Sequence, residues 1–333
     1  MRRSFQWVAL ISLIACGASS VEAQQRGQWT PGQSGLNAGV LGDTGLSFLN
    51  ITVDYAAHSL RDANGDSLPV SGSFNLWVIE NGFAYVPNVK VLGGHLKFVF
   101  FFPITNGSVV ADLGHPPQLH VSGGGSGYSD TWVQPFTLGW HLKRLDTYVG
   151  YAFVAPTGRY TAGASDNTGS GYWGNHILNG NTLYLTENMR TTANLLTIWE
   201  IHGEKETPST PSGQITHTTP GQSVTTEWGL GQTILLKKDS SRLLQLGVVG
   251  YDQWQVSDNG GNYLTDGRLV PASLDPHYSV HAIGAQASFI LPAKHLALFL
   301  KYEDEYSAKS RVRGHTIAFG GSWTVGVPKT ANP

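Results

Sequence analysis

Few residues of this chain have the type and spacing that catalysis would need. The nearest nucleophile–base pair is Ser279 with His281, which would share one face of a strand. Acyl transfer by such a pair needs a third polar group to orient the imidazole, and no nearby Asn or Asp is suited to this role. The twelve histidines are scattered, and none has the spacing of a metal site. We therefore expect no enzyme activity, no metal and no other cofactor.

Charged side chains on strand-like segments are better candidates for function. In residues 295–306 (HLALFLKYEDEY), Leu298 and Leu300 fall on one parity, whereas Lys301 and Glu303 fall on the other. Successive residues of a strand point to opposite faces, so one face is apolar and the other is charged. In a soluble protein the leucines would line the core. In a membrane barrel they would face lipid, and the charges would line a wet lumen. We favour the second assignment.

Seven side chains of lumen parity are candidates for selecting solutes. In a water-filled lumen such groups form a constriction or discriminate between ions. The alternative is a salt-bridged network that only maintains the shape of the barrel. The candidates are Lys97, His141, Glu227, Gln245, Lys301, Glu303 and Glu305.

About twelve strand-like segments would position these side chains. The gaps between them alternate between short and long, the rhythm of short periplasmic turns and long external loops. An even number of strands also allows closure. The sequence therefore predicts an all-β fold, a single antiparallel transmembrane β-barrel. The segments are 46–57, 73–86, 95–104, 130–142, 147–155, 171–186, 191–202, 223–236, 243–256, 278–291, 295–306 and 311–325.

The composition agrees with a barrel. Only 13% of the residues are charged, against roughly 25% in a typical soluble domain, while 41 glycines suit many tight turns. With a net charge of −2 and no basic block, the sequence does not have the charge pattern of a nucleic-acid-binding protein. No later stretch is long and apolar enough for a transmembrane helix. Tryptophans and tyrosines lie near predicted strand ends, as in the aromatic girdles of outer-membrane barrels.

The N-terminus has the pattern of a secretion signal. Arg2 and Arg3 precede an apolar run, and Val21-Glu22-Ala23 offers a cleavage site, so residues 1–23 are predicted to be a signal peptide. Cys16, the only cysteine, lies in a lipobox-like context and offers lipidation as the alternative. The polar segment 24–45 is expected to be irregular, 46–325 to form the outer-membrane barrel, and 326–333 to be a C-terminal tail.

Several stretches, taken in order, resemble the outer-membrane barrel family named for the meta-pathway of phenol degradation, the MetA-like proteins. The resemblance covers nearly all of the mature chain and implies a transporter linked to the degradation of aromatic compounds. The stretches include VKVLGGHLKFVFFFP (89–103), DTWVQPFTLGWHL (130–142), YVGYAFVAPTGRY (148–160) and GVVGYDQWQVSDN (247–259).

The hypothesis is an outer-membrane barrel of a Gram-negative cell for passive, porin-like uptake of small hydrophobic or aromatic compounds. Its expected partners are membrane lipid, the solute and the barrel-assembly machinery. The usual assembly signal is a terminal aromatic residue, but here VPKTANP follows Phe319 and Trp323 of the last strand. Two alternatives are an outer-membrane lipid-modifying hydrolase and a secreted soluble β-sandwich that binds a ligand.

Overall fold

Twelve long strands form the wall of the molecule in a computed structural model that describes residues 27–113, 119–208, 214–265 and 267–326. The predicted signal peptide, Cys16 and most of the predicted tail lie outside these residues. The described part contains no helix long and apolar enough to cross a membrane. The long strands are β1 (Gly45–Leu60), β2 (Val70–Val86), β4 (Gly94–Leu113), β7 (Thr131–Leu142), β8 (Leu145–Ala155), β9 (Gly174–Tyr184), β10 (Thr191–His202), β13 (Ser223–Leu235), β14 (Leu243–Gln255), β17 (Ser279–Leu291), β18 (Leu296–Lys309) and β19 (Val312–Val325).

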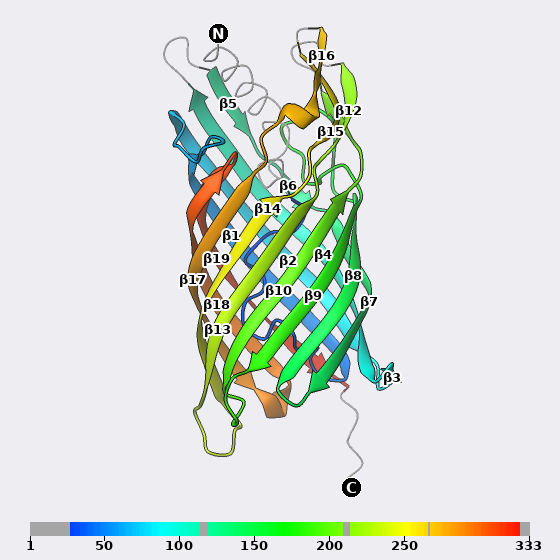
Figure 1. Cartoon of the computed structure of the whole chain (residues 1–333), viewed down its shortest axis with the longest axis vertical. Coiled ribbons are helices and arrows are strands. Elements are labelled where there is room, and N and C mark those ends of the chain that lie inside the picture. The colour runs from blue at the N-terminus through cyan, green and yellow to red at the C-terminus, as the bar shows by residue number, and fades with distance from the viewer. Residues whose placement is uncertain (1–26, 114–118, 209–213, 266, 327–333) are drawn as a thin grey trace.

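The sheet closes on itself. Each long strand pairs antiparallel with its neighbours in sequence, and β1 pairs with both β2 and β19, which joins the two ends of the chain of strands. The remaining gap is closed by pairing between β2 and β4 along most of their length (Figure 1). The predicted twelve-stranded barrel is confirmed, and the soluble β-sandwich is excluded. Closure leaves no unpaired strand edge, which is the condition for crossing lipid with strands.

The two faces of β18 point as its alternating sequence predicted, with the leucines outside and the charges in the lumen. Leu298 and Leu300 are 47% and 58% exposed on the outside. Lys301 and Glu303 are 2% and 1% exposed, since they point into the lumen. The outer surface of the barrel therefore presents an apolar face to the bilayer.

The aromatic girdle is only partly as predicted. Tyr85, Trp254 and Tyr306 are exposed on the outside of the barrel. Trp132 and Tyr172 also lie near predicted strand ends and so belong to the predicted girdle, but they are 9% and 6% exposed and line the interior. Their strand-end positions suggested a girdle, but the side chains point inward.

The long connections lie together at one end of the barrel (Figure 1). They carry short strands of their own, and four of these form a separate small sheet in the order β11-β12-β15-β16. Strand β4 continues to Leu113, beyond the predicted end at residue 104, because its extension pairs with β2 and β5. The short elements are β3 (Lys90–Val91), β5 (Leu119–Gly123), β6 (Ser126–Tyr128), β11 (Lys205–Pro208), β12 (Ile215–Thr219), β15 (Gly260–Thr265), β16 (Arg268–Pro271), and the 3₁₀ turns η2 (Ala272–Leu274) and η3 (Pro292–Lys294).

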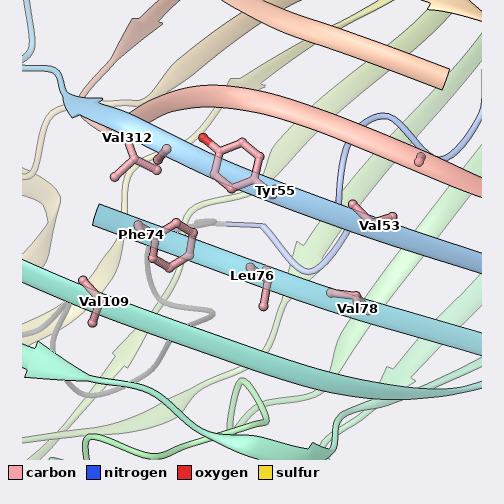
Figure 2. Packing of buried hydrophobic residues seen from close by; sticks show 9 residues of the cluster. Val53, Tyr55, Phe74, Leu76, Val78, Val109 and Val312 are labelled. Carbon is pink, nitrogen blue, oxygen red and sulfur yellow. The ribbon is translucent and has the colours of Figure 1, made fainter. Parts of the chain in front are cut away.

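Apolar side chains fill the lumen toward the long-loop end of β1, β2 and β4. Figure 2 shows Val53 and Tyr55 of β1 beside Phe74, Leu76 and Val78 of β2. Tyr55 and Phe74 meet edge to face, with ring centroids 5.9 Å apart. This cluster forms one end of an apolar inner wall that continues around the barrel to β10.

Candidate functional site: a lumen divided between a chain segment and a cavity

The segment 27–44 passes through the barrel as irregular chain, without helix or strand (Figure 1). It meets Glu200 near the long-loop end of β10, and it leads into β1, which begins at Gly45 at the opposite end. We call residues 27–44 the inner segment. This placement was not predicted from the sequence, because the contacts join residues far apart in the chain.

Two carboxylates hold the N-terminal half of the inner segment, which lies nearer the long loops. Glu200 accepts hydrogen bonds from the backbone N–H groups of Gln28 and Trp29, at 2.7 and 2.9 Å. Glu227 accepts bonds from Trp29 Nε1 at 2.7 Å, from the Gly32 N–H at 3.0 Å and from the Ser34 N–H at 2.5 Å. Charged acceptors make the stronger hydrogen bonds of proteins. These two side chains replace the partners that secondary structure would give the backbone.

Amide and hydroxyl groups hold the C-terminal half of the inner segment, which lies nearer the short turns. Asn37 exchanges side-chain hydrogen bonds with Gln245, at 2.7 and 3.1 Å. The Gly39 N–H donates to Thr182 Oγ1 at 2.9 Å. A Cβ at Gly39 would lie 2.3 Å from the carbonyl oxygen of Asp146, so only glycine fits this close to the wall.

Glycines of the barrel wall form a seat for Leu36, which is 8% exposed. A Cβ at Gly229, Gly231 or Gly247 would lie 2.8 to 3.0 Å from the Leu36 methyl groups. These glycines occupy β13 and β14, where side chains would otherwise fill the lumen. The segment and the wall are thus complementary in shape.

Five of the seven predicted lumen residues are buried on this side of the barrel. Lys301 donates to the Ser34 carbonyl and lies 3.5 Å from Glu303 Oε2. Glu305 makes contacts within the barrel only, with Arg311 at 3.3 Å and with two tyrosine hydroxyls at 2.9 Å. Glu227, Gln245, Lys301, Glu303 and Glu305 are all at most 2% exposed.

The other two predicted residues lie elsewhere. His141 is at the short-turn end, with its side chain 69% exposed and hydrogen-bonded to Asp146. Lys97, on β4, lines a cavity on the opposite side of the lumen. The structure thus brings five of the candidates together and leaves these two apart.

The cavity is the part of the lumen that the inner segment leaves open. It has a volume of about 480 Å³, within the range of roughly 300–1,000 Å³ typical of small-molecule sites. One wall is mainly apolar and comes from seven consecutive strands, β1 to β10 around the sheet. Its side chains are Leu49, Ile51, Leu76, Val78, Val99, Phe101, Trp132, Val154, Leu178 and Leu196.

Aromatic rings concentrate at the middle of the cavity. Trp29 of the inner segment lies 5.4 Å from Trp132 of β7, and the Trp132 ring lies 4.7 Å from that of His176. Phe101 packs against the same cluster. Large rings here provide a surface on which another flat ring can stack.

A loop carboxylate closes the cavity on the long-loop side. Asp130, directly before β7, accepts bonds from the Gly158 N–H at 3.0 Å, the Ser170 N–H at 2.7 Å and Ser170 Oγ at 2.6 Å. Burial raises the pKa of the Asp130 carboxyl, while the bonds from Ser170 and Gly158 oppose that rise. Asp130 therefore fastens the long loop between β8 and β9 to the rim.

The Ser279–His281 pair lies outside this site. His281 Nδ1 is hydrogen-bonded to Asp252 Oδ1 at 2.7 Å, so our expectation that no carboxylate could orient this imidazole was wrong. Asp252 is 29 residues away in sequence but directly opposite on β14. Among the described residues no hydrogen bond joins Ser279 to His281. These residues also contain no cluster of metal-binding side chains.

A closed barrel with an apolar exterior and a partly open lumen defines the chain as an outer-membrane β-barrel. Residues 57–319 match the family described as "Putative MetA-pathway of phenol degradation". The chain belongs to this family, as the resemblance in its sequence indicated.

Solved structures share the architecture. The chain is similar to the COG4313 outer membrane channel from Pseudomonas putida F1, with 15% identity, a TM-score of 0.66 and coverage of 89% of this chain and 99% of that chain. The β domain of the Bordetella autotransporter BrkA gives 12% identity, a TM-score of 0.48 and coverage of 85% and 100%. At 15% identity the likeness to the Pseudomonas putida channel concerns the fold alone. No curated protein matches the chain.

Proposed function

We propose that the protein is a passive channel for uptake of small apolar or aromatic compounds across the outer membrane. The observation that carries this proposal is the cavity, which lies inside the barrel and has an apolar wall on seven neighbouring strands. The family description, which refers to phenol degradation, supports the solute class. The Pseudomonas putida protein of similar fold is named a channel, which supports the mode of action.

The division of the lumen supports an apolar solute. A polar solute would need the carboxylates and amides of the opposite wall, but the inner segment already covers Glu200 and Glu227. The barrel wall left open on this side carries mainly apolar side chains. Burial of an apolar solute there gains roughly 25 cal/mol per Å² of area removed from water.

The short-turn end of the cavity is the gate in this proposal. Leu41 lines the cavity there and lies against Gly139, and Gly39 is bound to Thr182. A solute that arrives from the long loops must displace this part of the inner segment before it leaves. The displacement needs only a few hydrogen bonds to open, so no energy coupling and no catalytic step is required.

The remaining partners follow from the same proposal. The apolar outer face would contact membrane lipid, and the barrel-assembly machinery would insert the chain, with Phe319 and Trp323 in its last strand. The hydrolase alternative gains nothing from the arrangement of Ser279 and His281.

The proposal is tested by filling the cavity. Val99 lines it from β4, whereas its neighbour Phe100 is 41% exposed on the lipid side. In cells that carry Val99→Trp, we expect uptake of ¹⁴C-naphthalene to fall to the level of cells without the protein. Phe100→Trp, the matched control, should leave uptake unchanged. Both variants are first shown to be folded by heat-modifiable migration on gels. Wild-type uptake by folded Val99→Trp would refute the proposal.

A further inference from the structure

The charges that line the cavity differ in how they are compensated. Every carboxylate there accepts a hydrogen bond from the protein. Glu80 accepts one from Gln33 at 2.8 Å, Asp130 is bound by Gly158 and Ser170, and Asp275 accepts bonds from Asn259 at 3.0 Å and Tyr263 at 2.6 Å. Each of these carboxylates therefore already has at least one hydrogen-bond donor from the protein.

Lys97 is the exception. It lines the cavity, and its ammonium group has no hydrogen bond or ion pair with any residue that the structure describes. Lys301, the other lysine on a barrel strand facing the lumen, is bound to the Ser34 carbonyl and paired with Glu303. Lys97 is half-buried in the cavity wall, and a partly desolvated cation without a protein partner favours a ligand that supplies the missing charge.

The surroundings of Lys97 suit a carboxylate. Its cross-strand neighbour on β7 is Thr137, whose hydroxyl oxygen accepts a bond from Gln134 and whose own proton remains to be donated. Tyr148 brings a phenol to the same end of the cavity from β8, opposite Gly139. These groups are hydrogen-bond donors near one positive charge.

The rest of the cavity suits a ring. Val99 and Phe101 follow Lys97 on the same face of β4, and Trp132 stands on the neighbouring strand. One cationic end and one aromatic body match a solute with one anionic end and one aromatic body. A multiply charged anion would find no second unpaired cation on this wall among the described residues.

We propose that the cavity binds aromatic monocarboxylates, with the carboxylate at Lys97 and the ring against Val99, Phe101 and Trp132. This inference rests on the proposed function and narrows its solute class. The carboxylate accepts hydrogen bonds from the Lys97 ammonium and from the Thr137 hydroxyl. The ring displaces water from the apolar wall.

The test measures binding to the purified full-length protein in detergent by calorimetry, with three ligands that share one ring. They are benzoate, benzyl alcohol and benzylamine, which are anionic, neutral and cationic at pH 7. We expect benzoate to bind most tightly. Lys97→Met should weaken benzoate by roughly tenfold to a hundredfold, the range for a hydrogen bond to a charged group, and should leave benzyl alcohol unchanged. Lys97→Glu should favour benzylamine.

The controls separate the possible failures. Lys143→Met, in the exposed turn between β7 and β8, removes the same charge outside the cavity and should change nothing. If wild-type protein binds none of the three ligands, both the proposed function and this inference fail. If benzoate and benzyl alcohol bind alike and Lys97→Met changes neither, only the role of Lys97 fails. Acetate binding as tight as benzoate binding would overturn the role of the ring.

Discussion

Glu227 should control how firmly the inner segment is held. Its two carboxylate oxygens accept three hydrogen bonds from that segment, two on Oε1 and one on Oε2. In Glu227→Gln one oxygen becomes an NH₂ group. If the remaining oxygen serves Trp29 and Gly32, the NH₂ group faces the Ser34 N–H, and two donors oppose each other.

The cost can be worked out from these contacts. Loss of one hydrogen bond to a charged group costs about 1.5–3 kcal/mol. The other two bonds lose their charge assistance, which contributes roughly half of their strength, or about 1 kcal/mol each. The sum of about 3.5–5 kcal/mol corresponds to a change of roughly three orders of magnitude in the opening equilibrium of residues 29–34. Contacts at Glu200 and Gln245 remain, so the opening is local.

Hydrogen exchange measures this equilibrium directly. The amides of Gly32 and Ser34 should exchange roughly 10³ times faster in Glu227→Gln than in the wild type. Glu305→Gln is the matched control, because Glu305 is equally buried but bonds only to the barrel. Unchanged exchange in Glu227→Gln would refute the reasoning, as would an equal acceleration in both variants.

Two further predictions follow from the seat of the segment and from the outer face. Leu36→Ala should cost about 2–5 kcal/mol of docking free energy, because Leu36 fills a glycine-lined seat, and it should speed exchange around residue 36 while the barrel strands keep their protection. Leu300→Lys should reduce the free energy of unfolding in vesicles by about 2–4 kcal/mol in urea titrations. Leu274→Lys, similarly exposed but in the long loops, should change it little. Equal effects would contradict the lipid-facing assignment of Leu300.

The barrel could be predicted from the sequence because its signal is local. Alternation can be recognised from a few consecutive residues. The low total charge then indicates that the apolar face of the strands lies against lipid and not in the core of a soluble protein. Leu298, Leu300, Lys301 and Glu303 were therefore placed on the correct faces. The extension of β4 and the strands of the long loops were not predicted, because they depend on pairing between loops rather than on alternation.

The inner segment could not be predicted because its contacts are distant. Glu227 lies 193 residues from Ser34, and Thr182 lies 143 residues from Gly39. The Gly, Ser, Asn and Gln residues of the inner segment would be equally typical of a solvent-exposed linker. The one usable sign was on the barrel, where glycines such as Gly229 and Gly231 occupy lumen parity and leave room for something else.

The two walls of the lumen follow from the chemistry of the inner segment. An irregular chain inside a barrel has backbone N–H and C=O groups that no ladder satisfies, and each unsatisfied group is costly. Carboxylates and hydroxyls can accept bonds from these N–H groups, while a donor such as Lys301 satisfies a carbonyl, so the segment lies mainly along β10, β13, β14 and β18. The opposite wall is mainly hydrocarbon and contacts the segment through few polar groups, such as Glu80, which accepts a bond from Gln33. That side is left open to an apolar solute, and Lys97 is the one charged side chain there that has no hydrogen bond or ion pair among the described residues.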